Sequence, residues 1–495
     1  MGILESVSGG SSPDTAIKRS LTDNLIYLDG KLGGSFDFKI RRTAFSGVDA
    51  AFVCLDGMCN NEEIFLSVTN PIFGAAQLPE APQALYETIR DRLSSNVQQS
   101  ELLTLDDAVD AILAGNLLLL TDGVTRCLNF SVQGYPKKSI EAPQSSMQER
   151  GSHEGFTDSF KDNATLIRRR LKTPELCIEN LKAGAGIKTD ILLCYMKARA
   201  PVETVQAVKS ALNAMKIDYI SGEGCIEPFL EPNGNYIFRS VGDTERPDVF
   251  CAKLTEGKIG IIVDGTPHAL VTPYTFAENF QALDDYQKRP YYALFLRAIR
   301  ILSFIAGVFL PGLYTAVTMY HPEMIPADVL YNIASSQVKT PFPVMMEGLL
   351  IHIIYEIVRE AGLRMPKAVG HAVSIVGALI IGDAAVTAGL ISAPMLIIVA
   401  LTAVTSAVIS EIHDPVSVLR LVFIVVGGLT GVYGIFLGAG LILLNICAEE
   451  PMGYPFSLPA LPFKKEAARD MLVRRDWRVL GRKRYSLSAY LKNGR

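Results

Sequence analysis

Features typical of enzymes and metalloproteins are missing from this sequence of 495 residues. None of its 8 cysteines belongs to the C-x2-C pair that metal and redox sites favour, and no G-x-x-x-x-G-K-[ST] phosphate loop occurs. We therefore expect no enzyme activity, no metal and no cofactor. The cysteines are expected to be free thiols, because all but Cys447 precede the apolar part of the chain and suit a reducing cytoplasm.

Charge is scarce in one long stretch of the chain. Residues 291–447 carry 7 Lys or Arg and 8 Asp or Glu, against 29 and 38 in residues 1–290 and 11 and 5 in residues 448–495. This distribution predicts an acidic soluble part, a membrane part and a basic cytoplasmic tail. Nucleic-acid binding is excluded as the main activity, since the short tail is the only basic block. The first 24 residues are polar and lack the apolar core of a signal peptide, so the front part is expected to stay where it is made.

The expected fold class is an α+β membrane protein, with two cytoplasmic α/β subdomains followed by a polytopic α-helical membrane domain. The first subdomain is expected at 35–135, after a flexible arm at 1–34. Within it, alternating Phe36, Phe38 and Ile40 predict a strand, and apolar spacing predicts helices over 81–94 and 106–114.

A linker and a second α/β subdomain follow. Residues 136–160 are rich in Pro, Ser, Gln and charge, which predicts the linker, and the second subdomain is expected at 161–290. A strand at 191–197, a helix at 202–215 and the start of a strand at 218–220 suggest a βαβ-like order. Asp264 ends an apolar strand before Gly265-Thr266-Pro267, and a carboxylate that caps its own turn is a commoner arrangement there than a catalytic one.

The transmembrane domain is expected at 291–447 and the basic tail at 448–495. Segments long and apolar enough to cross a bilayer, which needs about 20 residues, lie at 298–320, 368–391, 394–411 and 416–447. Closely spaced glycines in the last segment predict close packing against a neighbouring helix, with a ligand site as the rarer alternative.

A fifth helical segment, Pro343–Ala361, carries charge. His352, Glu356 and Glu360 share one face, while Glu347 lies near the opposite side. Lipid would not tolerate these groups, so this helix either lies at the membrane interface or turns them toward protein or water.

The distribution of Lys and Arg indicates the orientation. Arg297 and Arg300 open the first span and the tail is basic, so both ends are expected in the cytoplasm, with an even number of crossings. Keeping Arg364 and Lys367 on that side as well requires a re-entrant element, for which the long glycine-rich segment is the favoured place. Four crossings, or five or six, all remain open.

Asp383 lies inside the apolar segment 368–391, where a carboxylate is by default a functional candidate. The alternative is an acid near the helix end that pairs with a neighbouring chain or reaches interfacial water. Polar positions on such a helix, repeated around an oligomer axis, would line a cation path. The candidate pore or gating residues are Asp383, His371, Ser374, Thr387, Glu356, His352 and Glu360.

Several runs of residues, in the same order, are similar to the A subunit of GerA-type spore germinant receptors. They span roughly residues 35–475. In the soluble part they are Gly155-Phe156, Arg168–Arg170, Thr244–Asp248, Val263–Pro267 and Asp284–Tyr286, and in the membrane part Arg297–Tyr314, Tyr320–Pro326, Pro341–Leu350 and Glu356–Pro366.

This resemblance implies a multi-pass protein of the spore inner membrane, in contact with membrane lipid. Its implied partners are further copies of itself in a ring, thought to be a pentamer, a transporter-like B subunit that senses nutrients, and a C-subunit lipoprotein. The implied activity is a nutrient-gated cation channel that initiates germination. Motif positions with an expected structural role are Glu245, Arg246, Pro247, Asp248, Asp264, Gly265, Pro267, Pro311, Pro322, Glu323 and Pro326.

The chain departs from the family pattern at Asp383, where members commonly carry Gln, and this departure adds a formal charge. The sister branch of the stage V sporulation protein AF type shares the architecture, although Glu347–Pro366 is more similar to the receptor A subunit. A solute transporter subunit and a non-conducting signalling scaffold are two competing functions for such a chain. The absence of internal repeats disfavours transport.

Overall fold

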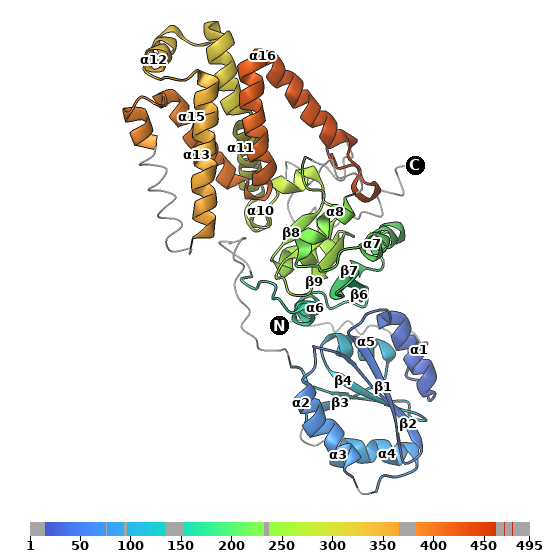
Figure 1. The fold of residues 1–495 in the computed structure, drawn as a ribbon. Coiled ribbons are helices and arrows are strands. Elements are labelled where there is room, and N and C mark those ends of the chain that lie inside the picture. Colours follow the sequence, from blue (N-terminus) through green and yellow to red (C-terminus); the bar gives the residue numbers. More distant parts are fainter. Residues whose placement is uncertain are drawn as a thin grey trace, which may run out of the picture. The chain divides into compact units, whose positions relative to one another are not determined.

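The computed structural model describes residues 15–75, 77–93, 97–134, 152–231, 237–365 and 382–461, together with 470 and 478 (Figure 1). The described residues form two compact units. The first contains residues up to 231 and 241–273, and the second contains 237–240 and the residues from 274 onward. The first unit holds two β-sheets, and the second is helical.

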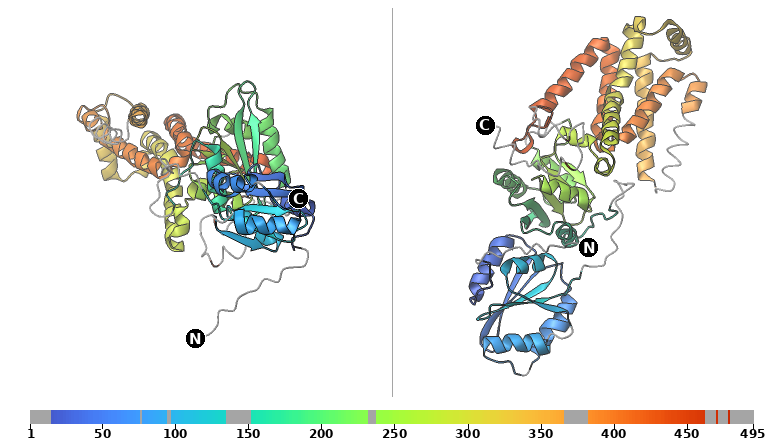
Figure 2. Two further views of the ribbon diagram at one scale, coloured as in Figure 1. Left: turned by 90° about the horizontal axis from the view of Figure 1, so that it is seen from below. Right: turned by 180° about the vertical axis from the view of Figure 1, so that it is seen from behind.

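The first sheet has the order β1-β2-β4-β5-β3, and every neighbouring pair is antiparallel. It lies between two helical layers, as the right-hand view of Figure 2 also shows. Alternate side chains of one strand serve both layers, with Ala51 and Val53 on one face and Ala50 and Phe52 on the other. The strands are β1 (Phe38–Phe45), β2 (Val48–Leu55), β3 (Gln99–Leu102), β4 (Leu117–Thr121) and β5 (Cys127–Phe130).

Helix α1 (Leu21–Leu32) corrects the expectation of a flexible arm over residues 1–34. It packs with α5 (Leu105–Leu113) on one face of the first sheet, through buried Leu21, Leu25 and Leu28. The opposite layer contains α2 (Asn61–Glu63), η1 (Ile64–Thr69), α3 (Asn70–Phe73), α4 (Pro82–Thr88) and η2 (Ile89–Leu93).

The second sheet has the order β6-β7-β9-β10-β8 and is also entirely antiparallel. The expected βαβ-like order is therefore wrong. Residues 218–220 form no strand, because Ile217 and Asp218 bond the turn between β6 and β7 through their carbonyl groups. The strands are β6 (Leu176–Ala183), β7 (Thr189–Met196), β8 (Gly242–Thr244), β9 (Ile259–Val263) and β10 (Ala269–Thr272), and the helices are α6 (Phe160–Arg170), α7 (Val202–Ala214), α8 (Glu227–Leu230) and α9 (Pro247–Thr255).

A buried ion pair joins the residues before β1 to the second sheet. Arg168 on α6 is 1% exposed and holds Asp37 with two hydrogen bonds, of 2.9 and 3.0 Å. It also donates to the hydroxyl of Ser35 and to the carbonyl of Leu176, at 2.8 and 3.1 Å. The Phe36 N–H donates to the Ile178 carbonyl of β6 at 2.8 Å. The two sheets therefore share a fixed polar junction.

The helical unit is a bundle of apolar helices. Its elements are α10 (Asp284–Gln287), α11 (Pro290–Tyr320), α12 (Ala327–Gln337), α13 (Val344–Arg364), α15 (Ala393–Val408) and α16 (His413–Ala448). Three of the expected spans correspond to α11, α15 and α16, and the charged fifth segment forms α13. The expected span 368–391 lies largely outside the described residues, which resume as a helix at 382–387.

Close contacts fix the directions of the helices within the bundle. A Cβ atom on Gly307 would lie 3.4 Å from Val416, and one on Gly427 would lie 2.4 Å from the Gly312 carbonyl oxygen, so α11 and the first part of α16 run the same way. A Cβ atom on Gly428 would lie 2.5 Å from Cγ of Met345, at the start of α13, while Arg420, earlier in α16, lies 3.9 Å from Glu356, later in α13, so α13 runs in the opposite direction to the first part of α16.

Helix α16 breaks at Gly431, where φ is 66° and ψ is −157°. Only glycine adopts this conformation readily, so the break depends on the residue type. The Tyr320 hydroxyl donates to the Gly428 carbonyl at 2.8 Å, which satisfies one of the carbonyl groups that the break frees. Two limbs, 413–430 and 432–448, diverge from this point in Figure 1. A Cβ atom on Gly438 would lie 2.8 Å from the Phe423 ring, so the second limb turns back toward the first and contacts it near the bend.

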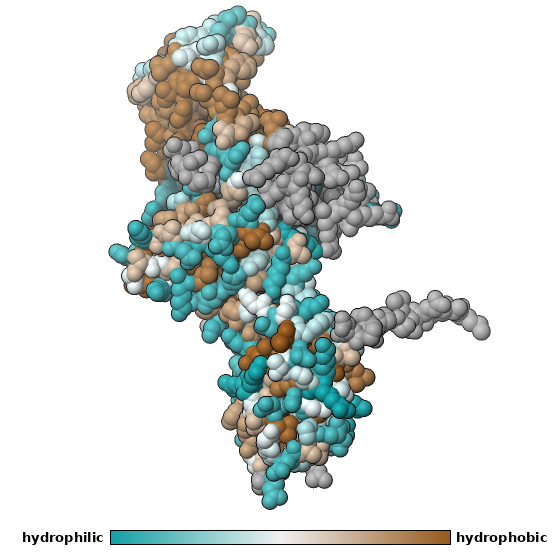
Figure 3. All heavy atoms as spheres, turned by 90° about the vertical axis from the view of Figure 1, so that its right-hand side faces the viewer, coloured by the Kyte–Doolittle hydropathy of each residue, from teal (hydrophilic) through white to brown (hydrophobic). Residues whose placement is uncertain are grey.

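Much of the surface of the helical unit is apolar. Figure 3 shows hydrophobic residues gathered over it, and exposed side chains of the second limb of α16 include Phe436, Leu437 and Leu441. In the described part of the chain, two helical stretches have the length and composition to cross a membrane, Pro290–Tyr320 and Ser410–Ala448, and α15 is a shorter apolar helix. Such a surface indicates contact with lipid or with other chains.

Candidate functional site

A cluster of buried and partly buried polar side chains lies between two helices of the bundle, and we call it the inner polar cluster. It consists of Glu356 and Arg359 on α13 with His413, Ser417 and Arg420 on α16. Arg359 Nε donates to Glu356 Oε2 at 2.7 Å, and His413 Nε2 lies 4.0 Å from the same oxygen. The Ser417 hydroxyl and His413 Nε2 are 3.2 Å apart. The two helices therefore meet through charge and not only through apolar contact.

Arg420 ties the inner polar cluster to the other two helices. Its side chain is 1% exposed, and one of its terminal nitrogens lies 3.9 Å from Glu356 Oε1. Its Nε donates to the Gly307 carbonyl of α11 at 2.9 Å, and another terminal nitrogen donates to the Ser406 hydroxyl of α15. The Arg420 guanidinium thus contacts groups from three other helices. A cation buried in an apolar bundle requires hydrogen-bond acceptors or negative charges of this kind around it.

His352 lies one turn before Glu356 on α13 and is also buried. Its Nδ1 lies 2.8 Å from the Gly348 carbonyl oxygen, and its Nε2 lies 3.4 Å from the Thr402 hydroxyl of α15. Because a ring nitrogen must donate to the carbonyl, Nδ1 carries the proton in this arrangement. Of the two arrangements expected for this helix, the contacts of His352 and Glu356 with neighbouring helices fit the one in which polar groups face protein.

The remaining candidate pore residues do not join the inner polar cluster. Glu360 is exposed and pairs with Arg364 at 2.7 Å. Asp383 and Thr387 are both exposed on the described helix at 382–387. His371 and Ser374 lie outside the described residues.

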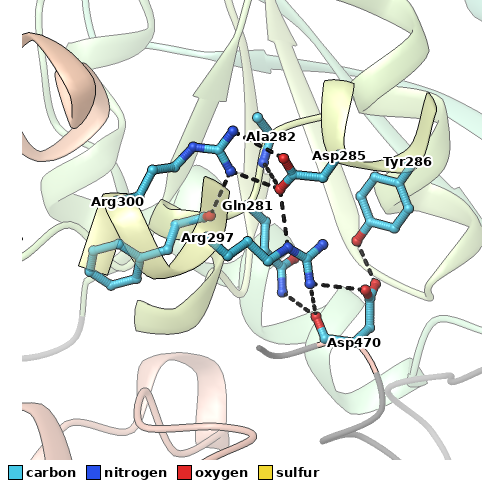
Figure 4. A network of polar contacts seen from close by, with 8 residues as sticks. Gln281, Ala282, Asp285, Tyr286, Arg297, Arg300 and Asp470 are labelled. Atoms are coloured by element: carbon cyan, nitrogen blue, oxygen red, sulfur yellow. Dashed lines mark hydrogen bonds and ion pairs between the residues drawn. The ribbon is translucent and has the colours of Figure 1, made fainter. Parts of the chain in front are cut away.

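A second polar network lies where α10 meets the beginning of α11 (Figure 4). The carboxylate of Asp285 is buried and accepts hydrogen bonds from Arg297 Nε at 3.1 Å and Arg300 Nη1 at 2.7 Å. Arg297 also donates to the Asp470 carbonyl and carboxylate at 2.6 and 3.1 Å, and the Tyr286 hydroxyl donates to the same carboxylate. Asp470, a residue of the basic tail, is therefore bound to the beginning of α11.

The motif Glu245–Asp248 forms the beginning of α9. Arg246 is buried and donates to both carboxylate oxygens of Asp248, at 3.2 and 2.7 Å, and to the Ser152 carbonyl at 2.9 Å, while Pro247 is the first residue of the helix. Glu245 Oε1 lies 3.0 Å from His268 Nε2. The Asp243 carboxylate beside the ring raises the pKa of His268, and the carboxylates of Glu223 and Glu245 add to this, although partial burial opposes it.

The other motif positions occupy turns and helix ends. Asp264 accepts a hydrogen bond from the Phe160 N–H, at the start of α6, at 3.3 Å, so its carboxylate supports a neighbouring helix and not the turn predicted for it. Gly265 has a φ of 90°, in the turn that also contains Pro267. Pro311 lies inside α11, and its carbonyl accepts from the Thr315 hydroxyl at 2.9 Å. Pro322 and Glu323 belong to the 3-10 turn η5 (Pro322–Met324), and Pro326 precedes α12.

Comparison with known proteins identifies the family. Residues 26–485 match the Bacillus/Clostridium GerA spore germination protein family. This chain is a member of the GerA family. It is 35% identical over 466 residues to spore germination protein KA of Bacillus subtilis, covering 93% of this chain and 85% of that protein. It is 34% identical to the uncharacterized membrane protein YfkQ of Bacillus subtilis, covering 95% of this chain and 92% of that protein.

A solved structure also matches part of this GerA-family chain. The crystal structure of the N-terminal domain of the A subunit of the Bacillus megaterium spore germinant receptor GerK3 is 28% identical to it, with a TM-score of 0.40. The match covers 53% of this chain and 98% of that domain.

Sequence reasoning missed two residues of these sites in the GerA-family chain. Arg420 is the only basic residue between 416 and 447, and a lone cation in an apolar run is a signal that could have found it. The pairing of Asp470 with Arg297 bridges 173 residues and has no local signal. Among the described residues, no group of three or more His, Cys, Asp or Glu could hold a metal ion.

Proposed function

We propose that this GerA-family chain is the A subunit of a nutrient-responsive germinant receptor and a multi-pass protein of the spore inner membrane. The inner polar cluster is the observation that carries this proposal. Its Arg420 is buried among helices whose outer surfaces carry large exposed apolar side chains. A polar interior inside an apolar exterior suits a bundle surrounded by lipid.

The helix directions support an orientation. The first limb of α16 runs with α11 and against α13, so the beginnings of α11 and α16 and the end of α13 fall at one end of the bundle. Arg300, near the beginning of α11, and Arg364, at the end of α13, both lie toward this end. Basic residues favour the cytoplasmic side. We therefore place this end, with the soluble domains and the tail, in the cytoplasm.

We further propose that several copies of the chain form a ring that conducts cations. The exposure of Asp383 and Thr387 on a single chain supports this idea, because a carboxylate on an apolar helix requires water or a neighbouring subunit. A transporter-like B subunit would bind the nutrient, and a C-subunit lipoprotein would complete the receptor. Nutrient binding would then shift the ring toward an open state, to which the nutrient-bound B subunit binds more tightly.

A solute transporter subunit is a second candidate, and the break in α16 favours it. Broken helices place free backbone groups at the binding sites of transporters. At Gly431, however, the Tyr320 hydroxyl already bonds the carbonyl groups of Gly428 and Leu429, at 2.8 and 3.3 Å. The break is thus occupied by the chain itself, and the channel is the better-supported proposal.

The test is cation flux through vesicles that contain the chain together with its co-expressed partner subunits. We expect nutrient-dependent potassium flux, altered in size or ion preference by Asp383→Asn. The matched control is Asp328→Asn, an exposed carboxylate on α12. Flux that is absent from the complete complex would overturn the channel, whereas normal flux in Asp383→Asn would remove Asp383 from the ion path.

A further inference from the structure

A buried carboxylate that forms no ion pair with any described residue lies near the start of α13. Glu347 is 1% exposed, and its Oε1 accepts hydrogen bonds from the Ser392 N–H and, at 2.6 Å, from the Ser392 hydroxyl. Its other oxygen, Oε2, is buried and has no hydrogen-bond partner among the described residues. An ionised carboxylate in such a place is costly unless a positive charge compensates it.

Two more buried polar atoms share this location. The Tyr314 hydroxyl on α11 and the Gln337 side-chain nitrogen on α12 also lack partners within the part of the chain that the structure describes. The side chains of Glu347, Ser392 and Gln337 lie close enough to the Tyr314 hydroxyl to interact with it electrostatically, although none of them forms a hydrogen bond of ordinary geometry with it. The end of α12 lies beside the turn before Ser392, because a Cβ atom on Gly389 would be 3.1 Å from the Lys339 carbonyl oxygen.

The chemistry of these atoms defines what they could bind together. The oxygen and nitrogen of a glutamine amide exchange places by a rotation, so Gln337 can present its oxygen to the same point. Glu347, Tyr314, Gln337 and Ser392 then supply one negative charge and four oxygen atoms. Hard cations prefer oxygen ligands, but calcium sites use several carboxylates and magnesium retains most of its water. A single carboxylate neutralises a monovalent ion.

We propose that Glu347, Tyr314, Gln337 and Ser392 form a binding site for one monovalent metal cation, sodium or potassium, where α11, α12, α13 and the start of α15 meet. The ion would compensate the buried carboxylate and occupy the unpartnered groups of three helices. This site is distinct from the inner polar cluster, and the inference does not rest on conduction by the chain.

The test measures thermal unfolding of the full-length chain in detergent. Sodium or potassium chloride replaces N-methyl-D-glucamine chloride, whose cation is too large for the site, at constant ionic strength. We expect the Tm to rise by about 2–4 °C between 1 and 300 mM of the preferred ion, because a ligand that binds only the folded state stabilises it. The ion that fits less well should produce a smaller rise.

Three variants separate this site from general salt effects. Glu347→Gln keeps the size of the side chain and should abolish most of the rise, and Tyr314→Phe removes one oxygen and should reduce it. Glu360→Gln changes an exposed carboxylate on the same helix and should keep the full rise.

Equal Tm values of the wild-type chain in all three salts would overturn the proposal, since water or a proton would then fill the site. An undiminished rise in Glu347→Gln would do the same. If Glu347→Gln does not fold, Tyr314→Phe decides, because a full rise there contradicts coordination by the hydroxyl. None of these Tm results depends on whether the chain conducts cations, so the flux assay tests the proposed function separately.

Discussion

A Cβ atom on Gly427 would lie 2.4 Å from the backbone carbonyl oxygen of Gly312. Helices α11 and α16 are therefore in backbone contact at this point. The contact lies between Arg420, which bonds the Gly307 carbonyl, and Tyr320, which bonds the Gly428 carbonyl. Close approach of the two backbones thus sets the register of the polar groups on either side of it.

Gly427→Ala should lower the stability of the bundle, because the added methyl group must displace one of the two helices. We expect a loss of about 1–3 kcal/mol, as in other overpacked interiors. Thermal unfolding of the full-length chain in detergent measures it. Gly440→Ala is the matched control, since a Cβ atom there meets nothing within 4 Å. Equal stability of the two variants would contradict the close contact.

Asp285→Asn should destabilise the packing of α10 against the beginning of α11. The Asp285 side chain is 0% exposed and compensates Arg297 and Arg300, so its neutralisation leaves Arg297, which is 1% exposed, with less compensation. Breaking a buried pair in this way costs about 3–5 kcal/mol. The same unfolding assay applies, with Asp284→Asn, the adjacent and less buried acid, as the control. A variant as stable as its control would show that the network of Figure 4 contributes little.

Arg168→Lys should loosen the junction between the two sheets, although it keeps the charge. A lysine ammonium cannot reproduce the two parallel bonds to Asp37 together with those to Ser35 and Leu176. Hydrogen exchange followed by mass spectrometry on the full chain should show faster exchange at 35–37 and 176–178. Arg169→Lys, at a side chain that is 33% exposed, should leave both segments protected. Unchanged protection in Arg168→Lys would refute a locking role.

His268 should make the stability of the first unit depend on pH. The Asp243 carboxylate raises its pKa, so the folded chain holds the proton more tightly than the unfolded chain does. The stabilisation is complete below the unfolded value of about 6.5 and disappears as the pH rises through the folded value. The stability difference between wild type and His268→Gln should therefore be larger at pH 5.5 than at pH 8.5. His153→Gln, at an exposed position, is the control, and a difference independent of pH would contradict the assignment.

The sequence predicted those parts of the fold that have a local signal. Alternating apolar residues indicated β1, and long apolar runs indicated α11, α15 and α16. Helix α1 also has such a signal, since Leu21, Leu25, Leu28 and Leu32 recur at helical spacing. The polar residues before it favoured a flexible arm instead, and that prediction was wrong.

The polar contacts between helices have no local signal of this kind. The cost of charge in lipid predicted that His352 and Glu356 face protein, water or the membrane interface, but it did not identify Arg420 as a neighbour of Glu356. Similarly, many glycines occur in α16, and only the packing of Tyr320 against Gly428 and Leu429 distinguishes Gly431 as the position of the break. The partner of a buried charge and the position of a helix break both depend on contacts between residues far apart in the chain, which composition and local spacing do not predict.

The reversal at Gly431 changes how the last apolar run should be counted. By hydropathy alone, Ser410–Ala448 counts as one membrane span. A single crossing would place the tail and His413 on opposite sides of the membrane. With two limbs that fold back on each other, this run returns the chain to the side from which it came. The tail and the start of α11 can then occupy the same compartment, where Asp470 meets Arg297. In the membrane topology proposed above, a single glycine would thus decide on which side of the membrane the carboxyl terminus lies.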